Sequence, residues 1–194
     1  RQGSAMKSVV LIGDSIRIGY QPTVEQLLGG QAQLWAPQKN GGTSANILAH
    51  LDEWVLSRSP DILHLNCGLH DMKTEFGAPS QGIPPDEYEA NLRQIVGGIG
   101  KLGSTQLIWA ATTPVNEAWH HARKPFDRFE ADVLAYNAIA HKVVTEHGVP
   151  INDLYQVMMD AGRDRQLSPD GVHFTPEGYA LLGKASADAI RAYL

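Results

Sequence analysis

The stretch that decides the fold of this 194-residue chain is Val9-Val10-Leu11-Ile12-Gly13-Asp14-Ser15. Its first four residues form an uninterrupted apolar run, which is typical of a strand whose two faces are both covered. Gly13, Asp14 and Ser15 end that run with residue types that favour turns and helix N-termini. The stretch therefore predicts a buried strand, Ser8–Gly13, whose carboxyl end delivers a serine hydroxyl to the start of a helix.

The same alternation of short apolar runs and longer amphipathic segments continues along the chain. Further strands are expected at 33–36, 61–67, 106–112 and 150–154. Helices are expected at 23–28, 44–57, 86–101, 128–147 and 176–193, with Ser44 and Asp86 as N-caps and Gly148 at a helix C-terminus. The pattern predicts a three-layer α/β/α, flavodoxin-like doubly wound sheet of about five parallel strands.

The length and composition fit one soluble globular unit. At ~150 residues per domain, we expect a single domain over 6–194, preceded by an expression-tag remnant at 1–5 with Met6 as the native start. No apolar stretch is long enough to cross a bilayer, so neither a membrane partner nor a membrane span is expected. The expected location is cytoplasmic, although a native leader sequence can have been lost.

Charge and cysteine content exclude several classes of function. Sixteen Lys and Arg against 21 Asp and Glu give a net charge of −5, and the basic residues are scattered, so nucleic acid is not an expected partner. The single cysteine, Cys67, excludes an internal disulfide framework and a multi-cysteine zinc site. We expect no metal and no cofactor. The segment 98–103 matches a dinucleotide-binding glycine pattern, but a helix precedes it and a strand follows, which is the reverse of the required order.

Two long connections follow predicted strands, Leu69–Pro85 and Pro114–Phe126, and so lie at the carboxyl edge of the sheet. Open α/β sheets place their ligands at that edge. Both loops are therefore candidates for shaping a site, with individual roles left open. Within the second loop, Trp119 could stack on a sugar or simply clamp the loop.

Ser15 and the late segment Asp170-Gly171-Val172-His173 together have the residue types for nucleophilic catalysis. A serine hydroxyl needs a base to take its proton, and a histidine base needs a carboxylate to orient it. Asp170 and His173 are three residues apart, so one loop can deliver both. The Ser15 backbone N–H, near a helix N-terminus, could hold a developing oxyanion. Each of these residues also has an explanation without catalysis. Ser15 could form a turn and a helix N-cap, Asp170 could open a turn, and His173 could cap the last helix.

These blocks, in this order, resemble the SGNH hydrolase family, also called GDSL esterases. Gly13-Asp14-Ser15 is similar to the family's first block and Asp170-Gly171-Val172-His173 to its last. Asn40-Gly41-Gly42-Thr43-Ser44 is similar to the block that supplies an oxyanion-hole glycine, with Gly42 as the better match and Gly41 as the alternative. The resemblance implies a catalytic triad of Ser15, Asp170 and His173.

One block departs from the family pattern. Gly68-Leu69-His70-Asp71 has a histidine where the family has an asparagine whose amide donates to the oxyanion. An imidazole N–H can make that hydrogen bond, so the resemblance implies an oxyanion hole of Ser15, Gly42 and His70. The alternative is that His70 only supports the loop while a backbone N–H supplies the third donor. A histidine can also titrate near neutral pH, unlike an amide.

The expected function is a serine esterase that hydrolyses small acyl esters through an acyl-serine intermediate. The resemblance makes O-acetyl groups on carbohydrate the first substrates to test. Two alternatives stay open: a non-catalytic ligand-binding module on the same fold, and an acyltransferase that uses the same triad. Neither the natural substrate, the acyl chain length nor the oligomeric state follows from the sequence.

Overall fold

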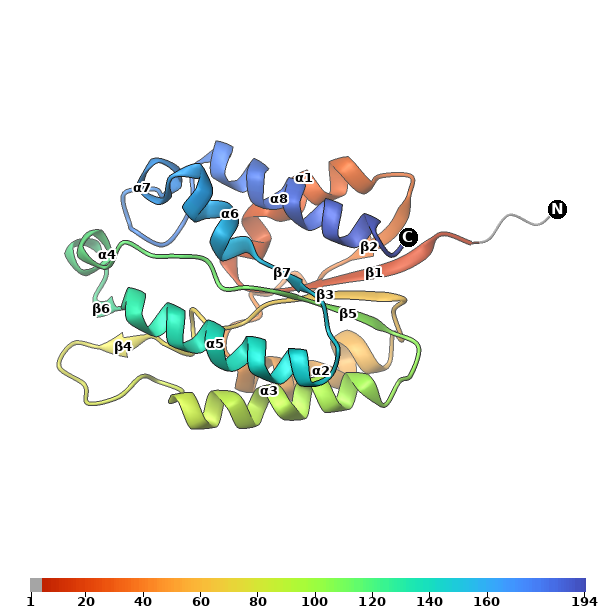
Figure 1. The fold of residues 1–194 in the computed structure, drawn as a ribbon, viewed down its shortest axis with the longest axis horizontal. Coiled ribbons are helices and arrows are strands. Elements are labelled where there is room, and N and C mark those ends of the chain that lie inside the picture. Colours follow the sequence, from red (N-terminus) through yellow and green to blue (C-terminus); the bar gives the residue numbers. More distant parts are fainter. Residues whose placement is uncertain (1–4) are drawn as a thin grey trace.

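A computed structural model describes residues 5–194 and places five parallel strands in one sheet, in the order β2-β1-β3-β5-β7 (Figure 1). The strands are β1 (Lys7–Ile12), β2 (Ala32–Trp35), β3 (Ile62–Leu65), β5 (Gln106–Ala110) and β7 (Ile151–Asn152). The predicted three-layer, doubly wound parallel sheet is confirmed. The expected tag remnant lies outside the described residues except for Ala5.

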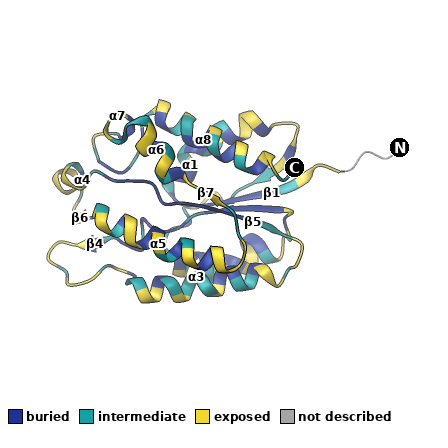
Figure 2. Ribbon diagram, viewed as in Figure 1, coloured by how far each residue is buried: buried dark blue, intermediate teal, exposed yellow. Residues whose placement is uncertain are grey.

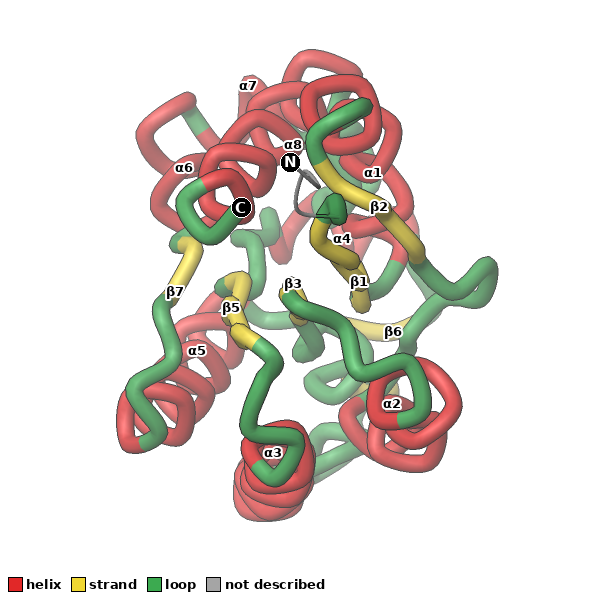
Figure 3. Tube along the Cα trace, turned by 90° about the vertical axis from the view of Figure 1, so that its right-hand side faces the viewer, coloured by secondary structure: helices red, strands yellow, loops and turns green. Residues whose placement is uncertain are grey.

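Helices cover both faces of the sheet. Figure 3 shows α1 (Ser15–Leu28), α6 (Leu154–Ala161), α7 (Arg163–Gln166) and α8 (Pro176–Arg191) on one side. On the other side lie α2 (Ser44–Leu51), α3 (Pro85–Gly100) and α5 (Glu130–Glu146). None of the helices in the described part of the chain is both long and apolar enough to cross a membrane.

The central strands are buried on both faces, which explains why they are continuous apolar runs rather than alternating ones. Val9 pairs with Leu34 on β2 and with Ile62 on β3, so β1 has a neighbour at each edge. All four residues of β3 are buried, including His64, and Figure 2 shows this layer as the dark centre of the molecule. His64 is a satisfied core residue: its Nε2 lies 3.0 Å from Asn152 Nδ2.

Helix α1 begins at Ser15, eight residues before the predicted start. Gly19 and Pro22 argue against a helix there on intrinsic propensity alone. Tertiary packing overrides that preference, since Ile16, Tyr20, Val24 and Leu28 recur every four residues and are all buried.

The predicted caps are correct at one position of three. Thr43 rather than Ser44 caps α2, with its Oγ1 accepting from the Asn46 N–H at 3.1 Å. Pro84 rather than Asp86 precedes α3, because prolines at positions 84 and 85 set the entry to the helix. Gly148 follows α5 at a φ of +68°, a conformation that glycine adopts without strain.

The predicted helix over 44–57 ends earlier as an α-helix and continues as a π-helical turn, Asp52–Leu56. Both long connections also contain short elements that no periodicity revealed. Strands β4 (Thr74–Glu75) and β6 (Phe126–Asp127) pair antiparallel outside the main sheet, and α4 (Glu117–Arg123) precedes β6. These elements gather at the carboxyl edge of the sheet, on the left of Figure 1.

Helices α1 and α8 pack closely because glycines face the contact. A Cβ on Gly183 would lie 2.4 Å from Thr23 Cβ and 3.0 Å from the Tyr20 carbonyl oxygen. We predict that Gly183→Ala lowers the free energy of unfolding by ~1–3 kcal/mol, because the helices must move apart. Urea unfolding measures this change.

The matched control is Gly97→Ala in α3, where a Cβ would meet no other atom within 4 Å. This variant should gain up to about 1 kcal/mol from helix propensity. Equal stability of Gly183→Ala and the unmodified chain would show that the α1–α8 contact is looser than described.

Candidate active site

The carboxyl edge of the sheet collects polar side chains from loops far apart in sequence. Ser15 opens α1 directly after β1, and Asp14 caps that helix by accepting from the Ile16 N–H at 2.9 Å. His70 lies in the turn after β3. Asp170 and His173 come from the loop before α8. Parallel strands all end at one edge, which places Ser15 and His70 there, and the loop that follows α7 brings Asp170 and His173 to the same place.

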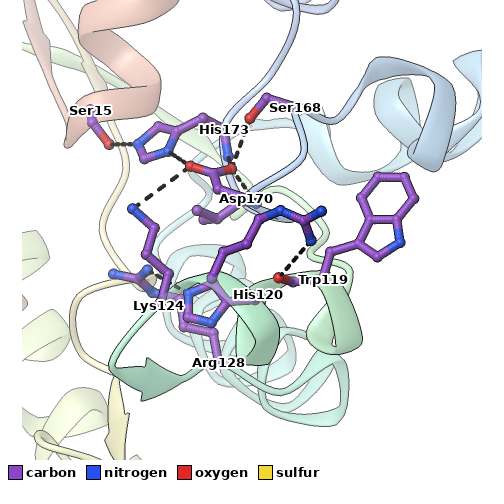
Figure 4. Close-up of polar contacts among 10 residues, drawn as sticks. Ser15, Trp119, His120, Lys124, Arg128, Ser168, Asp170 and His173 are labelled. Carbon is purple, nitrogen blue, oxygen red and sulfur yellow. Dashed lines mark hydrogen bonds and ion pairs between the residues drawn. The ribbon is translucent and has the colours of Figure 1, made fainter.

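Ser15, His173 and Asp170 form a continuous hydrogen-bonded chain (Figure 4). Ser15 Oγ lies 2.8 Å from His173 Nε2, and His173 Nδ1 lies 2.6 Å from Asp170 Oδ2. The carboxylate can accept only from a protonated Nδ1, which leaves Nε2 free to accept the serine proton. This geometry suits a hydroxyl nucleophile, its base and the acid that orients the base.

The two oxygens of Asp170 accept hydrogen bonds from different groups. Oδ1 accepts from the backbone N–H groups of Val172 and His173, each at 3.0 Å, and from Ser168 Oγ at 2.8 Å. Oδ2 binds the His173 ring. Asp170 therefore forms both the turn that was its structural alternative and the contact to His173, each through a different oxygen.

These hydrogen bonds decide the charge state of Asp170. Burial by itself would raise the pKa of the carboxyl group. The hydrogen bonds from the His173 ring and from the surrounding backbone and Ser168 groups outweigh burial and hold the pKa well below its ordinary value. Asp170 is therefore ionised throughout the neutral range and can stabilise a protonated His173.

The Ser15 backbone N–H donates to no other residue within 5–194, so it can donate to a bound oxygen atom. The two candidate glycines differ from it. The Gly42 N–H donates to Asn40 Oδ1 and the Gly41 N–H to the Gly13 carbonyl oxygen, both at 2.8 Å. A role for Gly42 as an oxyanion donor stays a prediction, and it requires Asn40 to turn away.

Asn40 is a polar group that the sequence reasoning missed at this site. Its Oδ1 must face Gly42, because a backbone N–H can only donate, so its Nδ2 faces the other way. Asn40 lines the same pocket as Ser15, His70 and His173. The Nδ2 group donates to no other side chain or backbone oxygen of the described residues.

His70 lines this pocket with a ring that makes no hydrogen bond to any other described residue. Burial lowers its pKa, and the nearby positive charges of Arg128 and Lys73 lower it further against the opposing effect of Asp14. The imidazole is therefore neutral at neutral pH and carries one N–H donor.

Two contacts hold the turn that carries His70. The Asp71 carboxylate is buried and accepts from the Ser44 N–H and, at 2.5 Å, from Ser44 Oγ. On the other side, Arg128 Nε donates to the Leu69 carbonyl oxygen at 2.6 Å. The position of His70 thus depends on α2 and on the segment before α5, and no local sequence pattern indicates either contact.

The rest of the pocket wall comes from the long loops. Leu69, Lys124, Phe126, Arg128 and Val172 join the residues above around a volume of about 180 Å³. Trp119 packs partly buried against the core. Over residues 5–194, no group of three or more His, Cys, Asp or Glu side chains is placed to hold a metal ion.

The chain is similar to known proteins both in sequence and in fold. Residues 11–181 match the model of the GDSL-like Lipase/Acylhydrolase family. A human protein described as "Isoamyl acetate-hydrolyzing esterase 1 homolog" is 27% identical over 122 residues, which are 59% of this chain and 49% of the human protein. The match thus spans about half the length of that relative.

Solved structures show the same fold at low sequence identity. A lipase/acylhydrolase from Enterococcus faecalis superposes with a TM-score of 0.82 and 23% identity over 96% of both chains. An acetylxylan esterase from Geobacillus stearothermophilus gives a TM-score of 0.74 and 20% identity over 95% of this chain and 94% of that chain.

The lowered pKa of Asp170 predicts a pH-dependent contribution to stability. A carboxyl group whose folded pKa is depressed stabilises the fold above its unfolded pKa of about 4, and this contribution is lost as the pH falls toward the folded value. Asp170→Asn should therefore be less stable than the unmodified chain at pH 7, and the difference should shrink at about pH 3. Urea unfolding at the two pH values measures it.

Asp160→Asn is the control, because Asp160 is an exposed carboxylate on α6 that accepts a hydrogen bond only from the Gln156 side chain among the described residues. Its stability difference should stay small at both pH values. If the difference for Asp170→Asn stayed constant with pH, the carboxylate would not be held ionised by these hydrogen bonds.

Proposed function

Because this chain belongs to the GDSL-like lipase/acylhydrolase family, we propose that it is a serine esterase that hydrolyses small acyl esters through an acyl-serine intermediate. The observation that carries the proposal is the chain of contacts from Ser15 Oγ to His173 Nε2, at 2.8 Å, and from His173 Nδ1 to Asp170 Oδ2, at 2.6 Å. O-acetyl groups on carbohydrate are the first substrates to test, since an acetylxylan esterase shares the fold.

The reaction takes place in two halves. His173 Nε2 takes the proton of Ser15 Oγ as the oxygen attacks the ester carbonyl, and the tetrahedral intermediate carries its charge on the former carbonyl oxygen. His173 then gives the proton to the leaving alcohol, and an acyl-serine remains. In the second half, His173 takes a proton from water as the water oxygen attacks the acyl carbonyl. His173 then gives this proton to Ser15 Oγ as the bond to the acyl group breaks and the acid leaves.

The negative oxygen of the intermediate needs donors in place before the reaction. The free backbone N–H of Ser15 and the N–H of neutral His70 supply two of them. The third position has two candidates, the Gly42 N–H and the Asn40 side-chain amide. Asn40 is favoured because its oxygen already holds the Gly42 N–H, which leaves the amide group facing the pocket.

The pocket volume supports a small acyl group. About 180 Å³ is less than the ~300–1,000 Å³ of pockets that enclose drug-sized ligands. A long acyl chain would extend beyond this space.

Hydrolysis of p-nitrophenyl esters from acetyl to octanoyl, by this protein and by Ser15→Ala, tests the proposal. We expect turnover that is highest for the shortest acyl groups and that disappears in the variant. Circular dichroism on the variant controls for folding. Equal turnover by the two proteins would show that Ser15 is not the nucleophile, and no turnover by either would favour a binding module.

His70→Ala should lower kcat by ~10²–10³, the usual loss for one oxyanion donor. His70→Asn should recover most of that loss, because an amide can donate in the same place. Since the pKa of His70 is lowered, the pH profiles of the unmodified protein and of His70→Asn should coincide above about pH 6.5. Unchanged turnover in His70→Ala would remove this residue from the reaction.

Asn40→Ala separates the two candidates for the third donor. If the amide donates, the variant loses kcat by a similar factor of ~10²–10³. If Gly42 donates instead, removing Asn40 frees the Gly42 N–H and turnover is kept or rises. Thermal unfolding of the variant shows whether the loop itself is intact.

A further inference from the structure

The wall of the pocket contains a buried cation, Arg128, that has no counter-ion within ion-pair distance among the described residues. Arg128 is only 6% exposed, and no carboxylate of the described residues lies within the 4.0 Å of an ion pair with it. Its Nε donates to the Leu69 carbonyl oxygen, and its Nη1 lies 3.2 Å from His120 Nε2. Its Nη2 group bonds to no other residue within 5–194.

A buried guanidinium without an acidic partner is unusual, because removing a charge from water is costly unless the charge is paired. The two acidic groups nearby, Asp170 and Asp14, already bind other groups. Asp170 holds His173 and the turn, and Asp14 caps α1 through Oδ1. Their long-range effect on Arg128 opposes, but does not cancel, the lowering of its pKa by burial.

A second cation faces the same space. Lys124 follows α4 and also lines the pocket, and its Nζ lies 3.8 Å from Asp170 Oδ2 (Figure 4). Arg128 and Lys73 lie over the ring of Phe126, with the guanidinium carbon 5.0 Å and the ammonium nitrogen 4.2 Å from its centre. Two cations, Lys124 and Arg128, therefore line a pocket whose wall also includes the carboxylate of Asp14.

We propose that Lys124 and Arg128 form a subsite for a carboxylate or similar acidic group of the ester substrate. The inference rests on the proposed esterase function and narrows its substrates to acidic esters, such as acyl esters of acidic sugars. The free face of the Arg128 guanidinium can bind a carboxylate, and the Lys124 ammonium adds a second, less directional contact. Phe126, whose ring lies under the Arg128 guanidinium, adds an apolar surface to the same pocket.

The leaving-group side is the favoured place for the acidic group. The leaving alcohol must approach His173 Nε2 to receive its proton, and Lys124 lies against the carboxylate that holds this same histidine. An acidic group on the acyl part of the substrate would bind the same two cations, with the ester turned the other way in the pocket.

Binding to the Ser15→Ala protein tests the subsite without requiring turnover. The ligands are two matched pairs: para-acetoxybenzoate and its methyl ester place a carboxylate on the alcohol side, and p-nitrophenyl hemisuccinate and p-nitrophenyl butyrate place it on the acyl side. We expect the acidic member of at least one pair to bind roughly 10- to 100-fold more tightly, the usual range for a hydrogen bond to a charged group. Calorimetric titration measures this ratio.

Two variants in the Ser15→Ala protein assign the preference to the pocket. Lys124→Met should remove most of the preference, and Arg128→Lys, which keeps the charge but not the planar fork, should reduce it. Lys142→Met, an equal change of charge on the exposed surface of α5, should leave the ratio unchanged. If Lys124→Met did not fold, Arg128→Lys alone would decide.

Equal binding of acidic and neutral members in both pairs would overturn the subsite, as would a preference that survives Lys124→Met and Arg128→Lys. Hydrolysis of the same esters by the unmodified protein separates the two proposals. Preferential binding without hydrolysis would contradict the esterase function and keep the subsite. Hydrolysis without preferential binding of the acidic esters would support the esterase function and contradict the subsite.

Discussion

Hydrogen bonds at the carboxyl edge of the sheet hold the starts of the functional loops in a fixed register. The pairing of β1 with its neighbours continues past the strands, with Gly41 N–H donating to the Gly13 carbonyl at 2.8 Å and Asn66 N–H to the Ile12 carbonyl at 3.1 Å. Farther along, Asn137 binds both the N–H and the carbonyl of Thr112, each at 2.9 Å. Because these backbone groups are buried, slipping the register would leave them unpaired at a cost of ~1–3 kcal/mol each. The placement of Ser15, directly after Gly13 and Asp14, follows from this constraint.

The second constraint is electrostatic and concerns charges held out of water. Asp170 stays ionised because four hydrogen bonds reach its two oxygens, and the same bonds shape the turn that presents His173. His70 is kept neutral by burial and by neighbouring cations. Arg128 is held in the pocket wall by the Leu69 carbonyl, a neutral acceptor that leaves its charge uncompensated. The neutral donor His70 and the cation Arg128 therefore line one small pocket together with His173, which the ionised Asp170 holds.

The sequence predicts most of the architecture, since apolar runs and their alternation with helices follow from burial alone. It misses the start of α1, where the packing of Ile16 and Tyr20 overrides Gly19 and Pro22. It also misses five elements of eight residues or fewer, which are too short to show a clear period: α4, α6, α7, β4 and β6. At the site, Ser15, Asp170 and His173 could be selected because their chemistry is visible in residue type and order. Asn40 and Arg128 could not, because their importance depends on which hydrogen-bonding groups remain free after folding.

The proposed esterase reaction requires that Ser15 Oγ becomes acylated. Rapid acid quenching of the protein during turnover of p-nitrophenyl acetate, followed by peptide mass spectrometry, detects that intermediate directly. We expect an acetyl group on the peptide that contains Ser15, transient in the unmodified protein and absent in Ser15→Ala. Steady hydrolysis with the acetyl group on another side chain, and none on Ser15, would contradict the proposed reaction.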